Sequence, residues 1–338
     1  MLYKIFIPLI IIFSLCAASI FRNNVWNDPV LLWSDTVNKS PKKIRPYVNL
    51  SAAYIGEKDL ERAEKILFKT TDVFRDVIFS GNIYYLGAAV DIFINFASLY
   101  GLKGDLVRVA EFLNKAYEIY PDSAKVNYAL GFFYMQLGDI EKAEDYFKKA
   151  LNFSADPLIY ARYSEIMEIK GRYDDALKYM SLAVELDPLN ADTRNRLGIL
   201  LKMSNRTEDA EIQWREAISI DKNFLPAYTN IGSLMYERGR LKEAYKLYMK
   251  AIEINAFYYE AYIGAGNALD DMGQNVLATE MYRSAISIDP QRIEGYVNLG
   301  IALEKAGKKE EAIKTYEEAL KIEQDNKEVL QKIWRLKG

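Results

Sequence analysis

Residues 225–258 read LPAYTNIGSLMYERGRLKEAYKLYMKAIEINAFY, residues 259–292 read YEAYIGAGNALDDMGQNVLATEMYRSAISIDPQR, and residues 293–326 read IEGYVNLGIALEKAGKKEEAIKTYEEALKIEQDN. Written one above the other, they place small residues in the same columns, which continue upstream at a spacing of 34 residues. The three columns hold Ala176, Ala210, Ala244, Ala278 and Ala312; Ala183, Ala217, Ala251, Ala285 and Ala319; and Ser164, Gly198, Gly232, Gly266 and Gly300. Small residues let two helices approach closely, so this period predicts repeated pairs of helices.

The other columns support helix pairs. Between the two alanine columns the large side chains are Phe147, Met180, Trp214, Tyr248, Tyr282 and Tyr316. The expected turns between the two helices of a pair contain Gly104, Gly138, Gly171, Gly239, Gly273 and Gly307. Glycine suits the end of a helix because it adopts the left-handed backbone conformation without a Cβ clash.

The pattern resembles the tetratricopeptide repeat, in which each unit is two antiparallel helices. This resemblance implies an all-α, right-handed α-solenoid of about eight helix-turn-helix repeats, with the first helix of each lining a concave face. Within residues 44–326, the repeat frame gives 44–77, 90–123, 124–156, 157–190, 191–224, 225–258, 259–292 and 293–326. Residues 78–89 are then an insertion, 23–43 a half-repeat helix and 327–338 a C-terminal capping helix.

The N-terminus carries an uncharged run, Ile5 to Phe21, between Lys4 and Arg22. Its 17 residues would span roughly 25 Å as a helix, close to the hydrocarbon thickness of a bilayer. We therefore expect residues 1–22 to be a single-pass transmembrane anchor or signal-anchor. A signal peptide cleaved near Ala18 and a buried helix are the alternatives. The array is expected to be extracytoplasmic, in a bacterial periplasm, with a cytoplasm-facing array as the other possibility.

Composition argues against most enzyme classes. The chain has no histidine and one cysteine, Cys16, so it lacks a histidine base, a histidine metal ligand and an internal disulfide. Its 44 basic and 47 acidic residues give a net charge of −3, which lacks the basic excess of a nucleic-acid-binding protein. We expect no enzymatic activity, cofactor, metal or nucleic acid, and a protein partner instead.

The sixth position of each repeat is the candidate binding site. In tetratricopeptide arrays that hold extended peptides, asparagines at this position bind the peptide backbone, and a carboxamide offers both a donor and an acceptor. The candidates are Asn49, Asn95, Arg162, Arg196, Asn230 and Asn298, where the two central arginines would suit an acidic peptide segment. The alternative is that asparagine is simply ordinary at this position. Phe257, Tyr258 and Tyr259 form a candidate hydrophobic contact patch.

Residues 20–50, IFRNNVWNDPVLLWSDTVNKSPKKIRPYVNL, resemble the junction at which the last membrane span of polytopic membrane glycosyltransferases enters a tetratricopeptide array. The resemblance carries over no catalytic residue. Three hypotheses follow. The first is a membrane-anchored scaffold that binds a protein or extended peptide and supports assembly of a membrane or periplasmic complex. The alternatives are an accessory module that presents acceptor polypeptide to a membrane glycosyltransferase, and a fixed structural subunit of a larger membrane complex.

Overall fold

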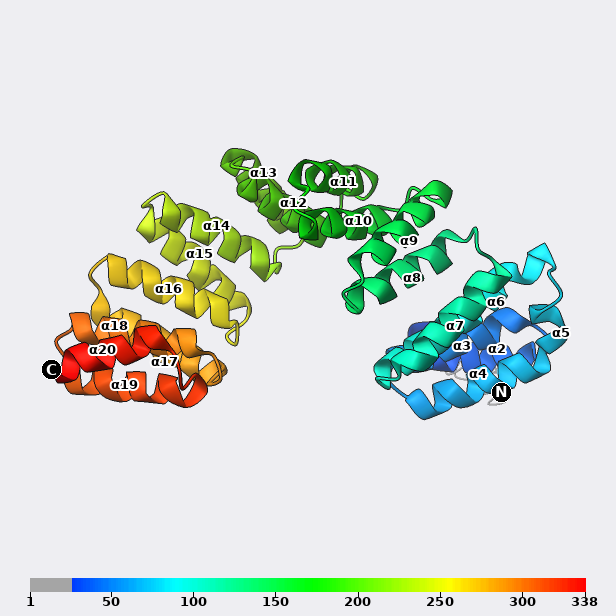
Figure 1. The fold of residues 1–338 in the computed structure, drawn as a ribbon, viewed down its shortest axis with the longest axis horizontal. Coiled ribbons are helices and arrows are strands. Elements are labelled where there is room, and N and C mark those ends of the chain that lie inside the picture. The colour runs from blue at the N-terminus through cyan, green and yellow to red at the C-terminus, as the bar shows by residue number, and fades with distance from the viewer. Residues whose placement is uncertain (1–25) are drawn as a thin grey trace, which may run out of the picture. The chain divides into compact units, whose positions relative to one another are not determined.

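The computed structural model describes residues 26–338, and over this range every regular element is a helix (Figure 1). The chain divides into unit 1, which ends at Ile166, and unit 2, Met167–Gly338. Unit 1 contains α2 (Pro29–Lys39), α3 (Ile44–Gly56), α4 (Leu60–Val73), α5 (Arg75–Ile78), α6 (Ile83–Leu102), α7 (Leu106–Ile119), α8 (Ala124–Gln136), α9 (Ile140–Phe153) and most of α10 (Pro157–Ile169). Unit 2 contains the end of α10, then α11 (Tyr173–Leu186), α12 (Ala191–Met203), α13 (Thr207–Ile220), α14 (Leu225–Glu237), α15 (Leu241–Ile254), α16 (Tyr259–Asp271), α17 (Asn275–Ile288), α18 (Ile293–Lys305), α19 (Lys309–Ile322) and α20 (Lys327–Lys337).

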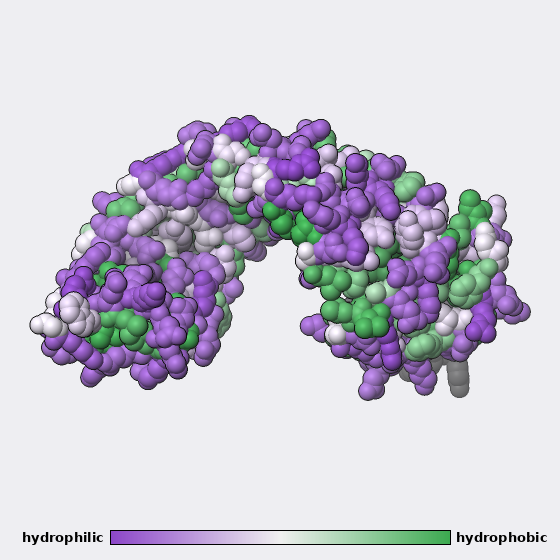
Figure 2. Space-filling model, in the orientation of Figure 1, coloured by the Kyte–Doolittle hydropathy of each residue, from purple (hydrophilic) through white to green (hydrophobic). Residues whose placement is uncertain are grey.

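The expected all-α class is confirmed over these residues. We refer to the first helix of each pair as helix A and to the second as helix B. On the face drawn in Figure 2 both units are largely hydrophilic, with hydrophobic residues exposed in smaller patches. The predicted membrane anchor, residues 1–22, and the signal-peptide alternative lie outside the described residues. Among those described, α6 alone is long and apolar enough to cross a membrane, but half of it is buried inside the protein, as in a core helix.

Local sequence signals define the helix boundaries. Asp59, Asp105 and Asp139 precede α4, α7 and α9, and each carboxylate accepts a backbone N–H three residues later at 3.1–3.2 Å. These side chains satisfy N–H groups that have no partner within the helix. The six turn glycines have φ between +71° and +76°. In two other pairs the same turn position holds Lys58 or Asn205, each with φ of +59°.

Within a pair, an aromatic ring from helix B lies against a glycine of helix A. A Cβ placed on Gly131 would be 2.9 Å from the ring of Phe147, which is shorter than real Cβ contacts. The equivalent pairs in unit 2 are Gly198–Trp214, Gly232–Tyr248, Gly266–Tyr282 and Gly300–Tyr316. All ten alanines of the two alanine columns are fully buried. The small-residue columns are therefore the places where helices A and B meet.

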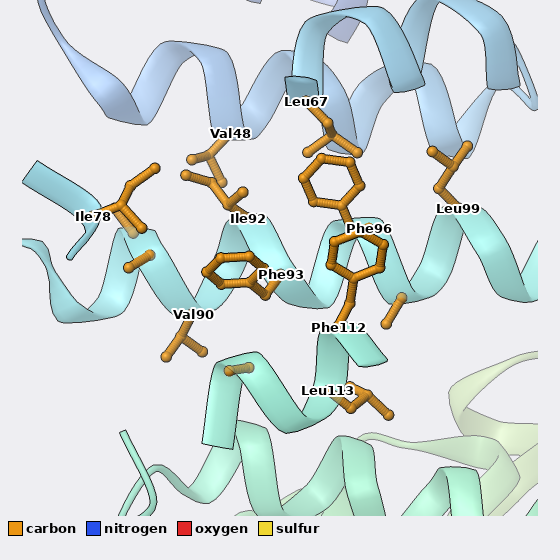
Figure 3. Close-up of a cluster of buried hydrophobic side chains, with 14 of the residues drawn as sticks. Val48, Leu67, Ile78, Val90, Ile92, Phe93, Phe96, Leu99, Phe112 and Leu113 are labelled. Carbon is orange, nitrogen blue, oxygen red and sulfur yellow. The ribbon is translucent and has the colours of Figure 1, made fainter. Parts of the chain in front are cut away.

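The core of unit 1 surrounds α6 and is rich in phenylalanine (Figure 3). The rings of Phe96 and Phe112 stack with their centroids 4.4 Å apart, and Tyr100 lies 5.5 Å from Phe112 in a parallel plane. The segment 78–89 contains the end of α5, a short loop and the first turns of α6. Helix α6 thus starts seven residues before position 90, where the repeat frame places it.

Candidate partner-binding surface

The A helices of neighbouring repeats lie next to one another, since α6 contacts α8, α14 contacts α16, and α16 contacts α18. The surface that they form in each unit is called the A face below. The position-six candidates lie on these A helices. The A face is therefore the first surface to examine for groups that a partner could reach.

Three of the candidate asparagines form hydrogen bonds to the preceding repeat. The Asn95 side chain donates to the Val48 carbonyl oxygen at 3.0 Å and to the Ser51 hydroxyl at 2.9 Å. In unit 2 the Asn230 amide donates to the Asn195 side-chain oxygen at 2.8 Å, and the Asn298 amide donates to that of Asn267 at 3.3 Å. These bonds fix the orientation of each carboxamide, and the side-chain oxygens of Asn95, Asn230 and Asn298 accept no bond from the described residues.

The remaining position-six candidates differ from this pattern. Asn49 is half-buried on α3, and Arg196 is half-buried on α12. The Arg162 guanidinium donates to both carboxylate oxygens of Glu165, at 2.8 and 3.0 Å, and lies 5.7 Å from the centre of the Phe132 ring. Burial alone would lower the pKa of Arg162, but the carboxylate of Glu165 raises it overall. The charge of Arg162 is thus already paired within unit 1.

A second set of bonds, not foreseen from the sequence, joins successive A helices at their C-terminal ends. In unit 2, position 12 of one repeat bonds position 13 of the next, 35 residues later. The pairs are Lys202–Glu237, Tyr236–Asp271 and Asp270–Lys305, with nitrogen–oxygen distances of 2.6 Å in both lysine pairs. The hydrogen bond to Asp271, together with burial, raises the pKa of Tyr236 to about 12. For the two lysine pairs, the sequence signal is opposite charge at one period plus one residue.

In unit 1 a carboxylate at position 2 connects three repeats. Asp91 accepts from Arg45 at 2.6 Å and from Lys125 at 2.5 Å, and its own side chain is only 16% exposed. These three residues all occupy the second position of their repeats. The A face is therefore stiffened by polar contacts between repeats as well as by its buried core.

The candidate aromatic patch is less exposed than its sequence suggests. Phe257 is 78% exposed in the turn before α16, whereas Tyr258 is half-buried and Tyr259 is buried. The guanidinium carbon of Arg292 lies 3.7 Å from the centre of the Tyr259 ring. Only one of the three rings, Phe257, offers a large surface to a partner.

Unit 1 also contains an open cleft of about 600 Å³ that the sequence did not reveal. Its floor is aromatic, formed by side chains that include Phe68, Phe79, Phe93, Phe96 and Phe112, and its rim is charged. Lys115, on the rim, pairs with Glu111 at 2.6 Å. The cleft lies where α5 and the early start of α6 interrupt the regular stacking of repeats. In residues 26–338, no group of three or more His, Cys, Asp or Glu side chains is placed to hold a metal ion.

Comparison with known proteins supports the repeat assignment. Sequence models of the tetratricopeptide repeat match residues 102–164, 225–258, 259–292 and 293–326. A Bos taurus protein, BBSome complex member BBS4, is 33% identical over 92 residues, which cover 25% of this chain. The chain spans only 18% of the length of that relative. No relative named here is a membrane glycosyltransferase, so the resemblance of residues 20–50 stays a prediction.

Solved structures share the fold. A tetratricopeptide repeat protein of Parabacteroides merdae superposes with a TM-score of 0.57 at 17% identity, covering 74% of this chain and 99% of that one. The pilF protein of Pseudomonas aeruginosa gives a TM-score of 0.55 at 17% identity, covering 62% and 96%. These likenesses concern the fold alone. The repeat matches at residues 102–164 and 225–326 identify the chain as a tetratricopeptide repeat protein, and the helix pairs and solved structures agree with that fold.

Proposed function

We propose that this chain is a membrane-anchored, non-enzymatic scaffold that binds a protein or an extended peptide on the A face. A tetratricopeptide fold is typical of protein-interaction scaffolds, which present a large surface rather than a reactive pocket. In this proposal the bound partner is held close to a membrane, where the scaffold supports assembly of a larger complex.

The observation that carries the proposal is the state of the position-six carboxamides. Asn95, Asn230 and Asn298 each use the amide nitrogen for a bond to the preceding repeat. Their orientation is thereby fixed before a partner arrives. Each side-chain oxygen remains an acceptor for a backbone N–H of an extended peptide, whatever the side chains of that peptide are. Pre-orientation reduces the entropy lost on binding.

The test compares the proteins captured by three forms of the full chain from detergent-solubilised membranes. The first is the wild type, the second carries Asn95→Ala, Asn230→Ala and Asn298→Ala, and the third is a matched control. The control carries Asn114→Ala and Asn152→Ala, which are exposed asparagines on helices B.

Quantitative mass spectrometry should find partners that the wild type and the control retain and the A-face variant loses. Circular dichroism checks that all three forms are equally helical. An identical set of partners for the A-face variant would contradict peptide binding by these carboxamides. Turnover of a small substrate by the purified chain alone would contradict the scaffold as a whole.

The proposed location is a single-pass membrane protein with an extracytoplasmic array. It is supported by the uncharged run of residues 5–21 at the N-terminus. Protease added outside spheroplasts should degrade the array while cytoplasmic marker proteins stay intact. Protection of the array until the membrane is lysed would instead favour a cytoplasm-facing array.

A further inference from the structure

One end of unit 1 combines exposed apolar side chains with unpaired cations. It is formed by the C-terminal ends of α2 and α4, the N-terminal ends of α3 and α6, and the short helix α5 (Figure 1). Two contacts bring these segments together. A Cβ on Gly87 would lie 3.4 Å from the Arg45 guanidinium, and the Lys69 ammonium lies 5.8 Å from the centre of the Tyr47 ring. We call this end the insertion edge.

The insertion edge exposes three large apolar side chains. Phe79 is 61% exposed, Ile83 is 78% exposed and Tyr84 is 88% exposed, and all three precede the first buried turn of α6. Ile83 and Tyr84 lie on the extra turns that α6 adds before its repeat begins, and Phe79 follows α5. Hydrophobic residues are visible at this end of unit 1 in Figure 2.

The segments that form the insertion edge also carry cations. Within the described residues Lys42, Lys43, Lys69 and Arg75 form no ion pair, and all four are exposed. Two exposed carboxylates of the same end, Asp72 and Asp76, also form none. In addition, Arg45 and Lys125 share the single carboxylate of Asp91, which leaves one positive charge in excess. Glu118, which lines the same cleft as Asp72 and Arg75, and Asp122, just before α8, are exposed carboxylates of this end as well, so its positive excess is small and its unpaired cations lie mainly on α4, α5 and the segment before α3.

We propose that the insertion edge rests on the headgroup layer of an anionic membrane. Tyrosine, phenylalanine and isoleucine side chains that project from a surface can enter the headgroup layer, while lysine and arginine attract anionic lipids. Ile83 and Tyr84 are largely exposed and do not line the cleft of unit 1, so a flat surface such as a membrane can reach them. This inference goes beyond the proposed function, because it does not depend on the A face or on the predicted anchor.

The test measures how close two ends of the same helix pair come to lipid. Cys16 is replaced by serine in the full chain, and a single cysteine is introduced at Ser80 on the insertion edge or at Val107, in the first turn of α7 near the opposite end of α6. Helix α6 has 20 residues and is about 30 Å long, so the two labels are well separated. Each form is labelled with nitrobenzoxadiazole and reconstituted in vesicles. The vesicles contain headgroup-spin-labelled lipid in either phosphatidylcholine or an equal mixture with phosphatidylglycerol.

In the anionic vesicles, quenching of the label at position 80 should exceed that at position 107 by about twofold or more, and the excess should shrink in pure phosphatidylcholine. With the label at 80, K42E/K43E and I83Q/Y84Q should each remove most of the excess. L106Q, at the opposite end, should leave it unchanged.

Equal quenching at positions 80 and 107 in both vesicle types would overturn the proposal. So would an excess that persists in both K42E/K43E and I83Q/Y84Q. A change in the emission of the label at 80 that depends on protein concentration and not on lipid would also overturn it, because it would assign the edge to a contact between copies of the chain.

Discussion

The indole ring of Trp214 lies directly on the backbone of Gly198. A Cβ added to Gly198 would be 2.4 Å from the indole nitrogen, and that nitrogen donates a hydrogen bond to the Asn195 carbonyl oxygen at 3.2 Å. The ring is therefore held both by its fit against α12 and by a polar contact one turn away. No side chain at position 198 can be accommodated unless the ring moves.

Gly198→Ala is accordingly expected to destabilise unit 2. Alanine favours a helix by about 1 kcal/mol relative to glycine, but overpacking by a Cβ this close to the ring should fall at the upper end of about 1–3 kcal/mol, so the net loss should be up to about 2 kcal/mol. Urea unfolding followed by tryptophan fluorescence measures the change in the free energy of unfolding.

Gly101→Ala is the matched control, since Gly101 is also helical and a Cβ there would only reach ordinary contact with Val109, at 3.9 Å. This substitution should be neutral or stabilising by up to about 1 kcal/mol. Equal losses for the two substitutions would mean that the fit of Trp214 on Gly198 is not the cause.

The aromatic stack of unit 1 should contribute more to stability than any exposed ring. Phe96 is 1% exposed and stacks on Phe112, so Phe96→Ala is expected to lower the free energy of unfolding by about 3–5 kcal/mol. Phe79→Ala removes an exposed ring from the same unit and should cost less than about 1 kcal/mol. Denaturant unfolding of both variants, monitored by circular dichroism, tests this. Similar losses would show that the stack in Figure 3 adds little.

High pH should weaken unit 2 through its buried tyrosines. Burial, with the nearby groups Tyr236 and Glu237, raises the pKa of Tyr248 to about 12. In the unfolded chain a tyrosine titrates near 10, so the folded state holds its proton over a range where the unfolded state has lost it. The free energy of unfolding is therefore unaffected by this tyrosine below a pH of about 10. As the pH rises from 10 toward 12, it falls by about 1.4 kcal/mol per pH unit for each such tyrosine.

The check is urea unfolding between pH 8 and 11. The wild type should lose stability above pH 10, and Tyr248→Phe should lose it less steeply, by about one tyrosine's share. The comparison is made between slopes, because the substitution also changes stability at pH 8. Identical slopes for the two proteins would show that Tyr248 does not carry the effect.

Sequence alone was sufficient for the helix pairs, because their signals are local and periodic. The glycine columns, the buried alanines and the turn glycines each follow from how two helices cross and how a helix ends. Lys58 and Asn205 show how far such signals extend, since both adopt the left-handed conformation without being glycine. At those turns the position in the repeat, rather than the residue type, predicts the left-handed backbone conformation.

The candidate site was harder to predict, because its state depends on contacts between repeats. The period was enough to align Asn95, Asn230 and Asn298 in one column. It could not predict that each amide nitrogen is already bonded to the preceding repeat. Bonds such as Asp270–Lys305 join residues 35 positions apart, one more than the period, so the two partners stand in different columns of the aligned repeats. The cleft in unit 1 depends on where an insertion redirects α6, which no periodic pattern specifies.

The shared carboxylate of Asp91 provides a last prediction, which concerns the stiffness of the A face. Asp91 pairs with both Arg45 and Lys125, so Asp91→Asn weakens two contacts that join three repeats. The partners are about 60% exposed, which limits the expected loss to about 1–2 kcal/mol in low salt. The loss should shrink in 1 M salt, where charges are screened beyond about 3 Å.

The matched control is Asp35→Asn, which breaks one exposed pair with Lys39 within a single helix and should cost less than about 0.5 kcal/mol. Because only Asp91→Asn acts between repeats, it alone should speed amide hydrogen exchange in both α3 and α8; equal exchange in the two variants would contradict a bridging role for Asp91.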